Sequence, residues 1–228
     1  FKPDIVICRP SLNKKVKKAI NISGLKNIYI KQFSKEYIQS KEDITQKTNS
    51  LTYKKDFYLL TLFTSGSTGL PKSIIHGHQN YPNYAKFTTE KFFKLKKGLT
   101  FFTATDAAWI NGQTYAFYGP LLIGATTVIS EDLTSLSKPE SLIDAFKELK
   151  INTFYTSVTF LRILRTNTFS IQNIKYEHLD RIGSCGEPLA DEVGKWAIKF
   201  FNPKSKLIIN TYFQTETGGI LTAPLDEN

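Results

Sequence analysis

Short apolar runs alternate with helix-like segments over most of this chain, and this alternation restricts the fold more than any other feature. The runs are short and mostly rich in β-branched or aromatic residues, as strands are. They lie at residues 100–103, 125–129, 153–155, 181–184 and 207–210. Helices are expected near them at residues 81–93, 114–122, 139–149, 158–165 and 191–201, with Pro120 limiting the regularity of the second. The order predicts an α/β fold with a largely parallel sheet flanked by helices on both faces.

The N-terminal part has a pattern of its own. Residues 4–8 predict a buried strand, residues 13–20 a basic helix and residues 27–30 a second strand, which together make a β-α-β segment. Residues 33–56 are polar and weakly periodic, and we expect a surface connection with one short helix there. We therefore expect one domain in two parts. Residues 1–57 form the β-α-β segment and the polar connection, and residues 58–228 form the core of the same domain.

Composition narrows the classes of protein to consider. The net charge is +10, but the lysines are scattered and no nucleic-acid-binding motif accompanies them, so we expect solvated basic faces and no nucleic-acid partner. No apolar run approaches the roughly 18 residues of a membrane span. The two cysteines, Cys8 and Cys185, lie far apart and predict structural thiols in a reducing, cytoplasmic compartment. Because the 228 residues include no methionine, we expect an internal segment of a longer polypeptide, cut at both ends.

Residues 64–73 read Thr-Ser-Gly-Ser-Thr-Gly-Leu-Pro-Lys-Ser and directly follow the apolar run 58–63. A loop of this kind suits phosphate, because glycines let the backbone approach a ligand, N–H groups bind anions and Lys72 adds a positive charge. The P-loop of nucleoside triphosphatases needs a glycine where this chain has Pro71, which has no N–H to give. An ordinary flexible loop is the alternative. The candidate phosphate-binding residues are Thr64, Ser65, Gly66, Ser67, Thr68, Gly69 and Lys72.

Two further unusual loops also follow strands, where ligands bind in parallel α/β sheets. Residues 183–188 read Gly-Ser-Cys-Gly-Glu-Pro, a sharp turn in which Gly186 lets another group come close, although a plain tight turn would look the same. Residues 210–219 read Asn-Thr-Tyr-Phe-Gln-Thr-Glu-Thr-Gly-Gly. So many polar groups would be costly in a core without ligands to pair them, and this run therefore predicts a binding loop.

Taken together, the motifs resemble the acyl-adenylate-forming, AMP-dependent synthetases, and within them the acetyl-CoA and propionyl-CoA synthetases. The loop at residues 64–73 resembles the family's phosphate loop, and Gly186-Glu187-Pro188 resembles a Gly-Glu-Pro triplet that acetyl-CoA synthetases have at this place in the order of motifs. Residues 212–219 are close to the family's Trp-Trp-Gln-Thr-Glu-Thr-Gly-Gly segment. Residues 108–115 resemble its Gly-Trp-Val/Ile-Thr-Gly-His-Ser-Tyr segment, although Trp109 and its neighbours would otherwise be taken as core. The likeness covers residues 58–225 with the motifs in order, and implies part of the large N-terminal domain of such an enzyme.

The resemblance implies ATP-dependent activation of a short-chain carboxylic acid to acyl-AMP, followed by transfer to coenzyme A, with Mg²⁺ as cofactor. Besides the phosphate loop, it implies these ATP- or AMP-binding residues: Gly186, Glu187, Pro188, Asn210, Thr211, Tyr212, Phe213, Gln214 and Thr215. Lys72, Thr215 and Glu216 would be catalytic, and Glu216 would bind Mg²⁺, which favours hard oxygen donors. The acyl pocket would be formed by Trp109, Ile110, Asn111, Cys185 and Phe213, and Asn111 would also contact coenzyme A.

The chain departs from the family pattern at several of these positions. Asn111 replaces threonine, Gln113 replaces histidine, Cys185 replaces valine, Phe213 replaces the second tryptophan and Asn210 replaces an aspartate. Because phenylalanine is smaller than the indole that closes the acetate pocket, we expect a pocket that accepts acetate and at least one longer acid such as propionate.

Alternatives remain at this stage. The family's catalytic lysine lies in a small C-terminal domain, and its ribose-binding aspartate and arginine lie beyond position 228, so the resemblance implies that the 228 residues alone are a poor catalyst. A non-catalytic nucleotide-binding module and a ligase for a different acid stay open. A P-loop phosphotransferase is disfavoured by Pro71. The oligomeric state is not predicted.

Overall fold

The computed structural model describes residues 3–32, 57–66, 69–130, 132–168 and 176–225. It contains two compact units, Phe1–Thr52 and Tyr53–Asn228. The expected connection at residues 33–56 and the loop residues Ser67 and Thr68 lie outside the described residues.

The first unit is a β-α-β segment. Strand β1 (Ile5–Cys8) is followed by a 3₁₀ turn, η1 (Pro10–Leu12), helix α1 (Asn13–Ser23) and strand β2 (Tyr29–Gln32). The strands pair in parallel, with Ile5 opposite Tyr29. Gly24 ends α1 in the left-handed conformation that glycine adopts without strain. The expectation of a buried first strand is wrong for this unit, since Ile5 and Ile7 are 57% and 65% exposed.

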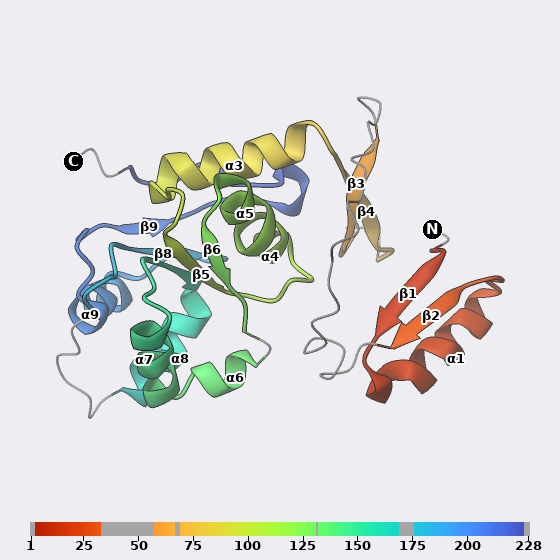
Figure 1. Cartoon of the computed structure of the whole chain (residues 1–228), viewed down its shortest axis with the longest axis horizontal. Helices are drawn as coiled ribbons and strands as arrows, with labels where there is room; N and C mark the ends of the chain where they lie inside the picture. Colours follow the sequence, from red (N-terminus) through yellow and green to blue (C-terminus); the bar gives the residue numbers. More distant parts are fainter. Residues whose placement is uncertain (1–2, 33–56, 67–68, 131, 169–175, 226–228) are drawn as a thin grey trace. The chain divides into compact units, whose positions relative to one another are not determined.

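The second unit is built on a five-stranded parallel sheet with the order β6-β5-β7-β8-β9 (Figure 1). Its strands are β5 (Thr100–Ala104), β6 (Thr126–Val128), β7 (Thr153–Ser157), β8 (Arg181–Cys185) and β9 (Ile208–Asn210). These are the strands that the sequence pattern predicts, shifted by at most a few residues. The α/β prediction with parallel strands is confirmed.

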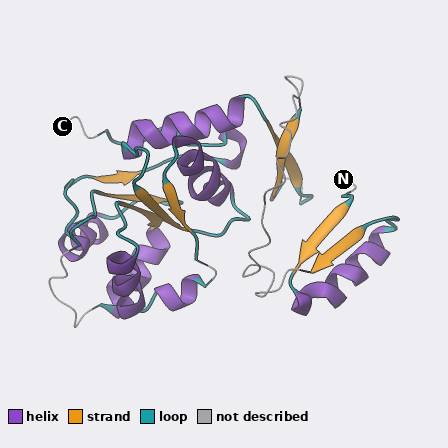
Figure 2. Cartoon of the chain, viewed as in Figure 1, coloured by secondary structure: helices purple, strands orange, loops and turns teal. Residues whose placement is uncertain are grey.

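The helices of this unit lie on both faces of the sheet (Figure 2). They are α3 (Asn80–Phe93), α4 (Ile110–Gly112), the π-helical segment η2 (Gln113–Tyr118), α5 (Gly119–Ile123), α6 (Leu133–Leu136), α7 (Pro139–Glu148), α8 (Val158–Asn167), α9 (Asp191–Phe201) and the 3₁₀ turn η3 (Thr215–Thr217). The sequence pattern did not predict α6. Its start could have been found at Asp132, whose carboxylate accepts from the backbone N–H groups of Thr134 and Ser135.

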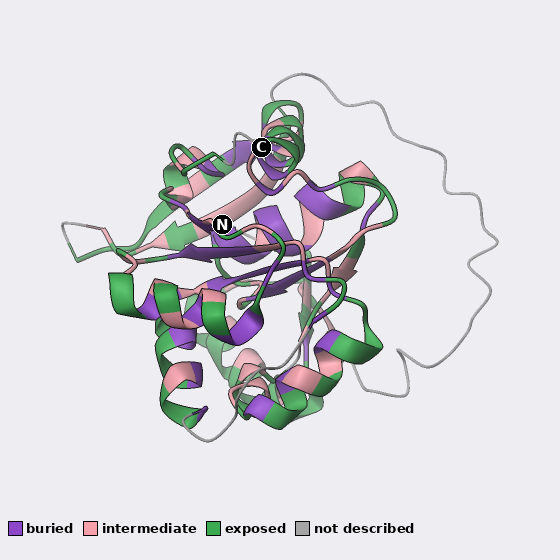
Figure 3. Cartoon of the chain, turned by 90° about the vertical axis from the view of Figure 1, so that its left-hand side faces the viewer, coloured by how far each residue is buried: buried purple, intermediate pink, exposed green. Residues whose placement is uncertain are grey.

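Neighbouring residues on each strand enter different cores, because successive side chains of a strand point to opposite faces. Phe102 and Phe154 pack with α7, α8 and α9 in one core, whereas Phe101 and Tyr155 pack with α3 and η2 in the other. Figure 3 shows the resulting buried sheet between exposed outer helix faces. Runs that are apolar on both faces are typical of strands covered by helices on two sides.

Pro120 explains the π-helical segment that precedes it. The helix predicted for residues 114–122 corresponds to η2 and α5, and in the structure it continues without a break from α4. Proline has no N–H, so the carbonyl four residues before it, that of Ala116, lacks its usual helical partner. The Thr127 hydroxyl donates to this carbonyl at 2.7 Å instead. The neighbouring carbonyl of Tyr115 accepts from the Thr103 hydroxyl at 2.7 Å, so the widened turn is tied to the sheet at two points.

The predicted phosphate loop, residues 64–73, connects two strands of an antiparallel hairpin, and its last two residues belong to the second strand, which corrects the sequence prediction. Strand β3 (Tyr58–Thr64) pairs with strand β4 (Lys72–Gly77), and Thr64 lies opposite Lys72. The sequence predicts a loop up to Ser73, but Lys72 and Ser73 belong to β4. The strand was missed because only Ile74 and Ile75 in it are large and apolar, which leaves no clear alternation.

Candidate functional site

A cavity of about 630 Å³ opens at the carboxyl ends of the parallel strands. Its lining comes from the segments that follow β5, β7, β8 and β9, together with α4 and Leu133 of α6. The lining residues are Ala104, Thr105, Asp106, Trp109, Ile110, Asn111, Leu133, Ser157, Phe160, Cys185, Gly186, Phe213, Gln214 and Thr215. Loops at this end of a parallel sheet are where α/β proteins bind small molecules.

Residues predicted from three separate stretches of sequence meet in this cavity. All five predicted acyl-pocket residues line it, and so do Gly186, Gln214 and Thr215 from the predicted nucleotide set. Ile110 and Cys185 are nearly fully buried, and Trp109 is 67% exposed. Gln113, where the family has histidine, does not line the cavity, and its amide donates to the Ala107 carbonyl at 2.6 Å.

Other predicted residues lie outside the lining. Among those that the structure describes, they are Thr64, Ser65, Gly66, Gly69, Lys72, Glu187, Pro188, Asn210, Thr211, Tyr212 and Glu216. The hairpin that carries Lys72 is joined to the loop after β9 by a hydrogen bond of 2.8 Å between His76 Nε2 and the Thr215 carbonyl. The roles of these residues remain predictions.

Six lining residues lie outside the predicted set, and for four of them the sequence contains a usable signal. Thr105 and Asp106 follow β5, and Ser157 and Phe160 lie where β7 passes into α8. The rule that ligands bind beyond the carboxyl ends of parallel strands applies to these two strands as well. The composition of these two segments is ordinary, so it does not distinguish them as the three unusual loops are distinguished.

A chain of buried hydroxyl groups holds the ends of β8 and β9 together below the cavity. The Thr211 hydroxyl donates to the Ser184 carbonyl at 3.0 Å, and Tyr155 in turn donates to Thr211 at 2.6 Å. The Ser184 hydroxyl donates to Asn210 Oδ1 at 2.9 Å. Asn210 and Thr211 therefore position the strand ends in this structure. Burial raises the pKa of Tyr155 well above its ordinary value, so its hydroxyl stays protonated.

The loop after β9 is secured by side chains from the helices beneath it. Tyr115 accepts from the Ile220 N–H at 2.7 Å, and Tyr84 donates to the Ile220 carbonyl at 2.7 Å. Thr114 donates to the Gly218 carbonyl at 2.6 Å. Nothing in the sequence pattern singled out these residues, because a buried tyrosine or threonine reads as ordinary core.

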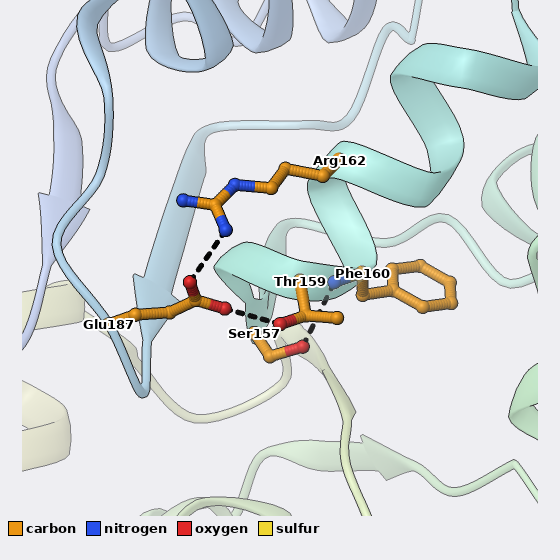
Figure 4. Close-up of polar contacts among 5 residues, drawn as sticks. All are labelled: Ser157, Thr159, Phe160, Arg162 and Glu187. Carbon is orange, nitrogen blue, oxygen red and sulfur yellow. Dashed lines mark hydrogen bonds and ion pairs between the residues drawn. The ribbon is translucent and has the colours of Figure 1, made fainter.

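The Gly186-Glu187-Pro188 turn is anchored to the start of α8 (Figure 4). Gly186 has φ +90°, a conformation that glycine adopts readily. The Glu187 carboxylate accepts from the Thr159 hydroxyl and pairs with Arg162 at 2.7 Å. Ser157 caps the same helix by accepting from the Phe160 N–H at 3.1 Å. The carboxylate of Glu187 is thus already paired within the protein, and it orients the turn that places Gly186 in the cavity wall.

Asn111 and Cys185 form a polar contact in the cavity wall. Asn111 Nδ2 donates to Cys185 Sγ at 3.3 Å, and the thiol donates to the Thr156 carbonyl at 3.6 Å. Burial raises the pKa of the Cys185 thiol from 9.0 to about 11, so the thiol is neutral near pH 7. A neutral buried thiol is a poor nucleophile, and Cys185 therefore acts in packing and hydrogen bonding.

The raised pKa of Cys185 predicts a loss of stability at alkaline pH. Above pH 9 the unfolded thiol loses its proton while the folded thiol, with a pKa of about 11, keeps it. The unfolded state is then favoured, so the free energy of unfolding should fall by about 1.4 kcal/mol per pH unit between pH 9 and 11. Urea unfolding from pH 7 to 11 measures this fall. Cys185→Ser should show a shallower decline, and an equal decline in both proteins would contradict the assignment.

The donor set around Thr215 is compatible with Mg²⁺ brought by a nucleotide. Glu216 is exposed on η3, next to Thr215 in the cavity lining. Within the described residues, no three histidine, cysteine, aspartate or glutamate side chains gather closely enough to hold a metal ion unaided. One carboxylate suits Mg²⁺, because this ion usually keeps several waters and takes further ligands from substrate phosphates.

No helix in the described part of the chain combines the length and the apolar character needed to cross a membrane.

Comparison with known proteins agrees with the geometry. The family model of the AMP-binding enzymes matches residues 3–228. An acetyl-coenzyme A synthetase of Methylobacterium radiotolerans is 32% identical over 83% of this chain and 29% of its own length. The acetyl-coenzyme A synthetase of Vibrio parahaemolyticus is 36% identical over 73% of this chain and 26% of its own length. Acetyl-coenzyme A synthetase 1 of Debaryomyces hansenii is 39% identical over 73% of this chain and 25% of its own length.

The chain thus spans between a quarter and a third of the length of these relatives. The family match, by contrast, runs through nearly all of its 228 residues and includes every segment that lines the cavity. The chain belongs to the family of AMP-binding enzymes.

Proposed function

We propose that this chain is the acid-activating part of an AMP-forming acid–coenzyme A ligase that uses ATP and a short-chain carboxylic acid. The observation that carries the proposal is the meeting of the predicted acyl-pocket residues with Gly186, Gln214 and Thr215 in one cavity. The two free thiols support a cytoplasmic location for this activity.

The reaction would proceed in two displacements. A carboxylate oxygen of the acid attacks the α-phosphorus of ATP, a new P–O bond forms, and pyrophosphate leaves with the electrons of the broken P–O bond. The sulfur of coenzyme A then attacks the acyl carbon after losing its proton, and AMP leaves. The first displacement needs alignment of the reactants and neutralisation of charge more than a protein nucleophile.

The residues would divide this work by position. Ile110, Cys185 and Phe213 would hold the acyl chain, and Thr215 would contact the α-phosphate. Glu216 would hold Mg²⁺, which supplies charge neutralisation on the phosphates when it is bound. Lys72 and the tip of the β3–β4 hairpin would hold the β- and γ-phosphates. The hydroxyl chain from Tyr155 to Ser184 would keep the two nucleotide-contacting loops in register.

The experiment is acid-dependent exchange of pyrophosphate into ATP, measured with the 228-residue chain and with the full-length product of its gene. Acetate, propionate, butyrate and acetoacetate are compared. We expect exchange with short acids from the full-length product, and at most weak exchange from the 228 residues. Binding of MgATP without exchange for any acid would instead support a non-catalytic nucleotide-binding module. Formation of ADP would support a phosphotransferase.

Discrimination between acetate and propionate should be modest. The cavity is much larger than either acid, and Phe213 stands where a larger indole would narrow it. One methylene in an apolar pocket is worth about 1–3 kcal/mol, so the two kcat/KM values should lie within roughly a hundredfold of each other. Steady-state exchange rates at varied acid concentration give this ratio. A preference for acetate well beyond that range would contradict the assigned pocket wall.

A further inference from the structure

His76 joins two parts of the candidate site that are far apart in the sequence. Its Nε2 atom lies 2.8 Å from the carbonyl oxygen of Thr215, a residue 139 positions away. A carbonyl oxygen can only accept, so Nε2 carries a proton and donates it. His76 belongs to β4, whereas Thr215 begins η3 and lines the cavity. One hydrogen bond therefore connects the hairpin to the loop that we expect to contact the α-phosphate.

The imidazole is held in place by close packing. His76 is only 9% exposed, and the ring of Tyr81 lies against it with centroids 4.8 Å apart. Gly218 leaves room for both rings, because a Cβ atom there would lie 3.0 Å from Cε1 of His76 and 2.9 Å from Cδ2 of Tyr81. Gly218 also has φ +71°, which glycine adopts without strain. The turn after Thr215 is thus shaped to receive the imidazole.

A pair of hydrogen bonds ties Tyr81 to the same turn. The Thr114 hydroxyl donates to the Gly218 carbonyl at 2.6 Å. Because its proton is used there, Thr114 accepts from the Tyr81 hydroxyl at 2.7 Å. His76, Tyr81, Thr114 and Gly218 therefore form a closed set of contacts, in which the imidazole has one well-defined position.

Lys72 lies on the same face of β4 as His76. Successive side chains of a strand alternate between its faces, so residues four positions apart share one, with Cα atoms roughly 13 Å apart at about 3.3 Å per residue. The strand is continuous between them, since its pairing with β3 runs without a shift from His76 opposite Leu60 to Lys72 opposite Thr64. Fixing His76 to Thr215 therefore sets where the Lys72 end of the hairpin lies relative to Thr215.

We propose that His76 is a positioning residue, whose hydrogen bond to the Thr215 carbonyl holds Lys72, on the β- and γ-phosphates, in register with Thr215, on the α-phosphate. This inference rests on the proposed function and concerns the nucleotide side of the same site. His76 itself touches no reacting atom. The first displacement depends on alignment, and a shift of about 1 Å caused by a distant substitution can lower the rate about a hundredfold.

The test compares His76→Met with His76→Gln in ATP–pyrophosphate exchange by the full-length product. The two new side chains have nearly the same length and volume, but only glutamine ends in an N–H donor. We expect His76→Met to lower kcat by about 10- to 100-fold and to leave KM for the acid unchanged, because the residues expected to hold the acyl chain lie outside the hairpin. His76→Gln should restore most of the lost kcat. Both variants lose the ring contact with Tyr81, so their melting temperatures should fall alike.

His78→Met is the matched control on the same hairpin. His78 Nδ1 lies 3.3 Å from the Phe57 carbonyl, and neither residue is among the described residues that line the cavity. This variant should keep the parent's kcat.

The outcomes separate this inference from the proposed function. Equal kcat values for His76→Met and His76→Gln would overturn the inference while leaving the proposed function intact, and so would a raised KM for the acid at unchanged kcat. If the methionine variant does not fold, His76→Leu removes the donor with less bulk and is compared with His76→Gln in the same way. No exchange by the parent with any acid would overturn the proposed function and this inference with it.

Discussion

Replacing Gly183 by alanine is expected to lower the free energy of unfolding by about 3 kcal/mol, because overfilling a packed core forces rings or backbone to move. A Cβ atom at this position would lie 2.6 Å from Cε1 of Phe93 and 2.7 Å from Cδ2 of Tyr155. Both rings are fully buried and contact each other, with centroids 4.8 Å apart. Neither can move without disturbing the core between the sheet and α3.

The matched control is Gly194→Ala in the interior of α9. There the new Cβ would meet Leu189 Cδ2 at 3.4 Å, an ordinary contact. Alanine is the better helix former, so this variant should gain about 0.5–1 kcal/mol. Urea unfolding of the parent and the two variants under identical conditions measures both effects. Similar values for the two variants would contradict the packing described for β8.

Replacing Glu216 by glutamine is expected to reduce kcat/KM for MgATP roughly 10²–10³-fold, the usual cost of losing one charge-stabilising group at a reacting phosphate or carbonyl. The substitution preserves shape and removes only the charge. Because Glu216 is exposed and belongs to the short turn η3, the melting temperature should not change. The Mg²⁺ concentration needed for half-maximal exchange should also rise, because an amide oxygen is a weaker ligand for a hard cation than a carboxylate is.

Glu148→Gln is the control for this variant. Glu148 is an exposed carboxylate at the end of α7 and does not line the cavity. The Glu148→Gln variant should retain the parent's rate of ATP–pyrophosphate exchange and its dependence on Mg²⁺ concentration. If Glu216→Gln behaves like Glu148→Gln, the assignment of Glu216 to the metal is wrong.

The parallel sheet could be predicted because its strands are short, continuous apolar runs in the sequence. Phe101-Phe102 and Phe154-Tyr155 are apolar on both faces, which only a strand covered from two sides requires. The β3–β4 hairpin gave no such signal in its second half. Only Ile74 and Ile75 of β4 are large and apolar, and the first two residues of the strand continue the polar run of the predicted loop.

Part of the cavity lining could be predicted because some of its loops have an unusual composition. Gly186 and Thr215 belong to loops whose composition is unusual, whereas Ser157 and Phe160 look like the ordinary start of a helix. The residues that position these loops, Tyr115 above all, act through single hydrogen bonds to a distant backbone. Such pairs join residues more than a hundred positions apart, and one sequence does not contain that information.

The most direct test of the account is a crystal structure of the full-length product with a hydrolysis-resistant acyl-adenylate analogue. The account predicts the acyl group between Ile110, Cys185 and Phe213, with the phosphate mimic beside Thr215. A second cavity of about 660 Å³, lined by residues that include His76, Tyr84 and Phe87, offers a distinct alternative. An analogue bound there, or one whose acyl group points away from Asn111, would contradict the account.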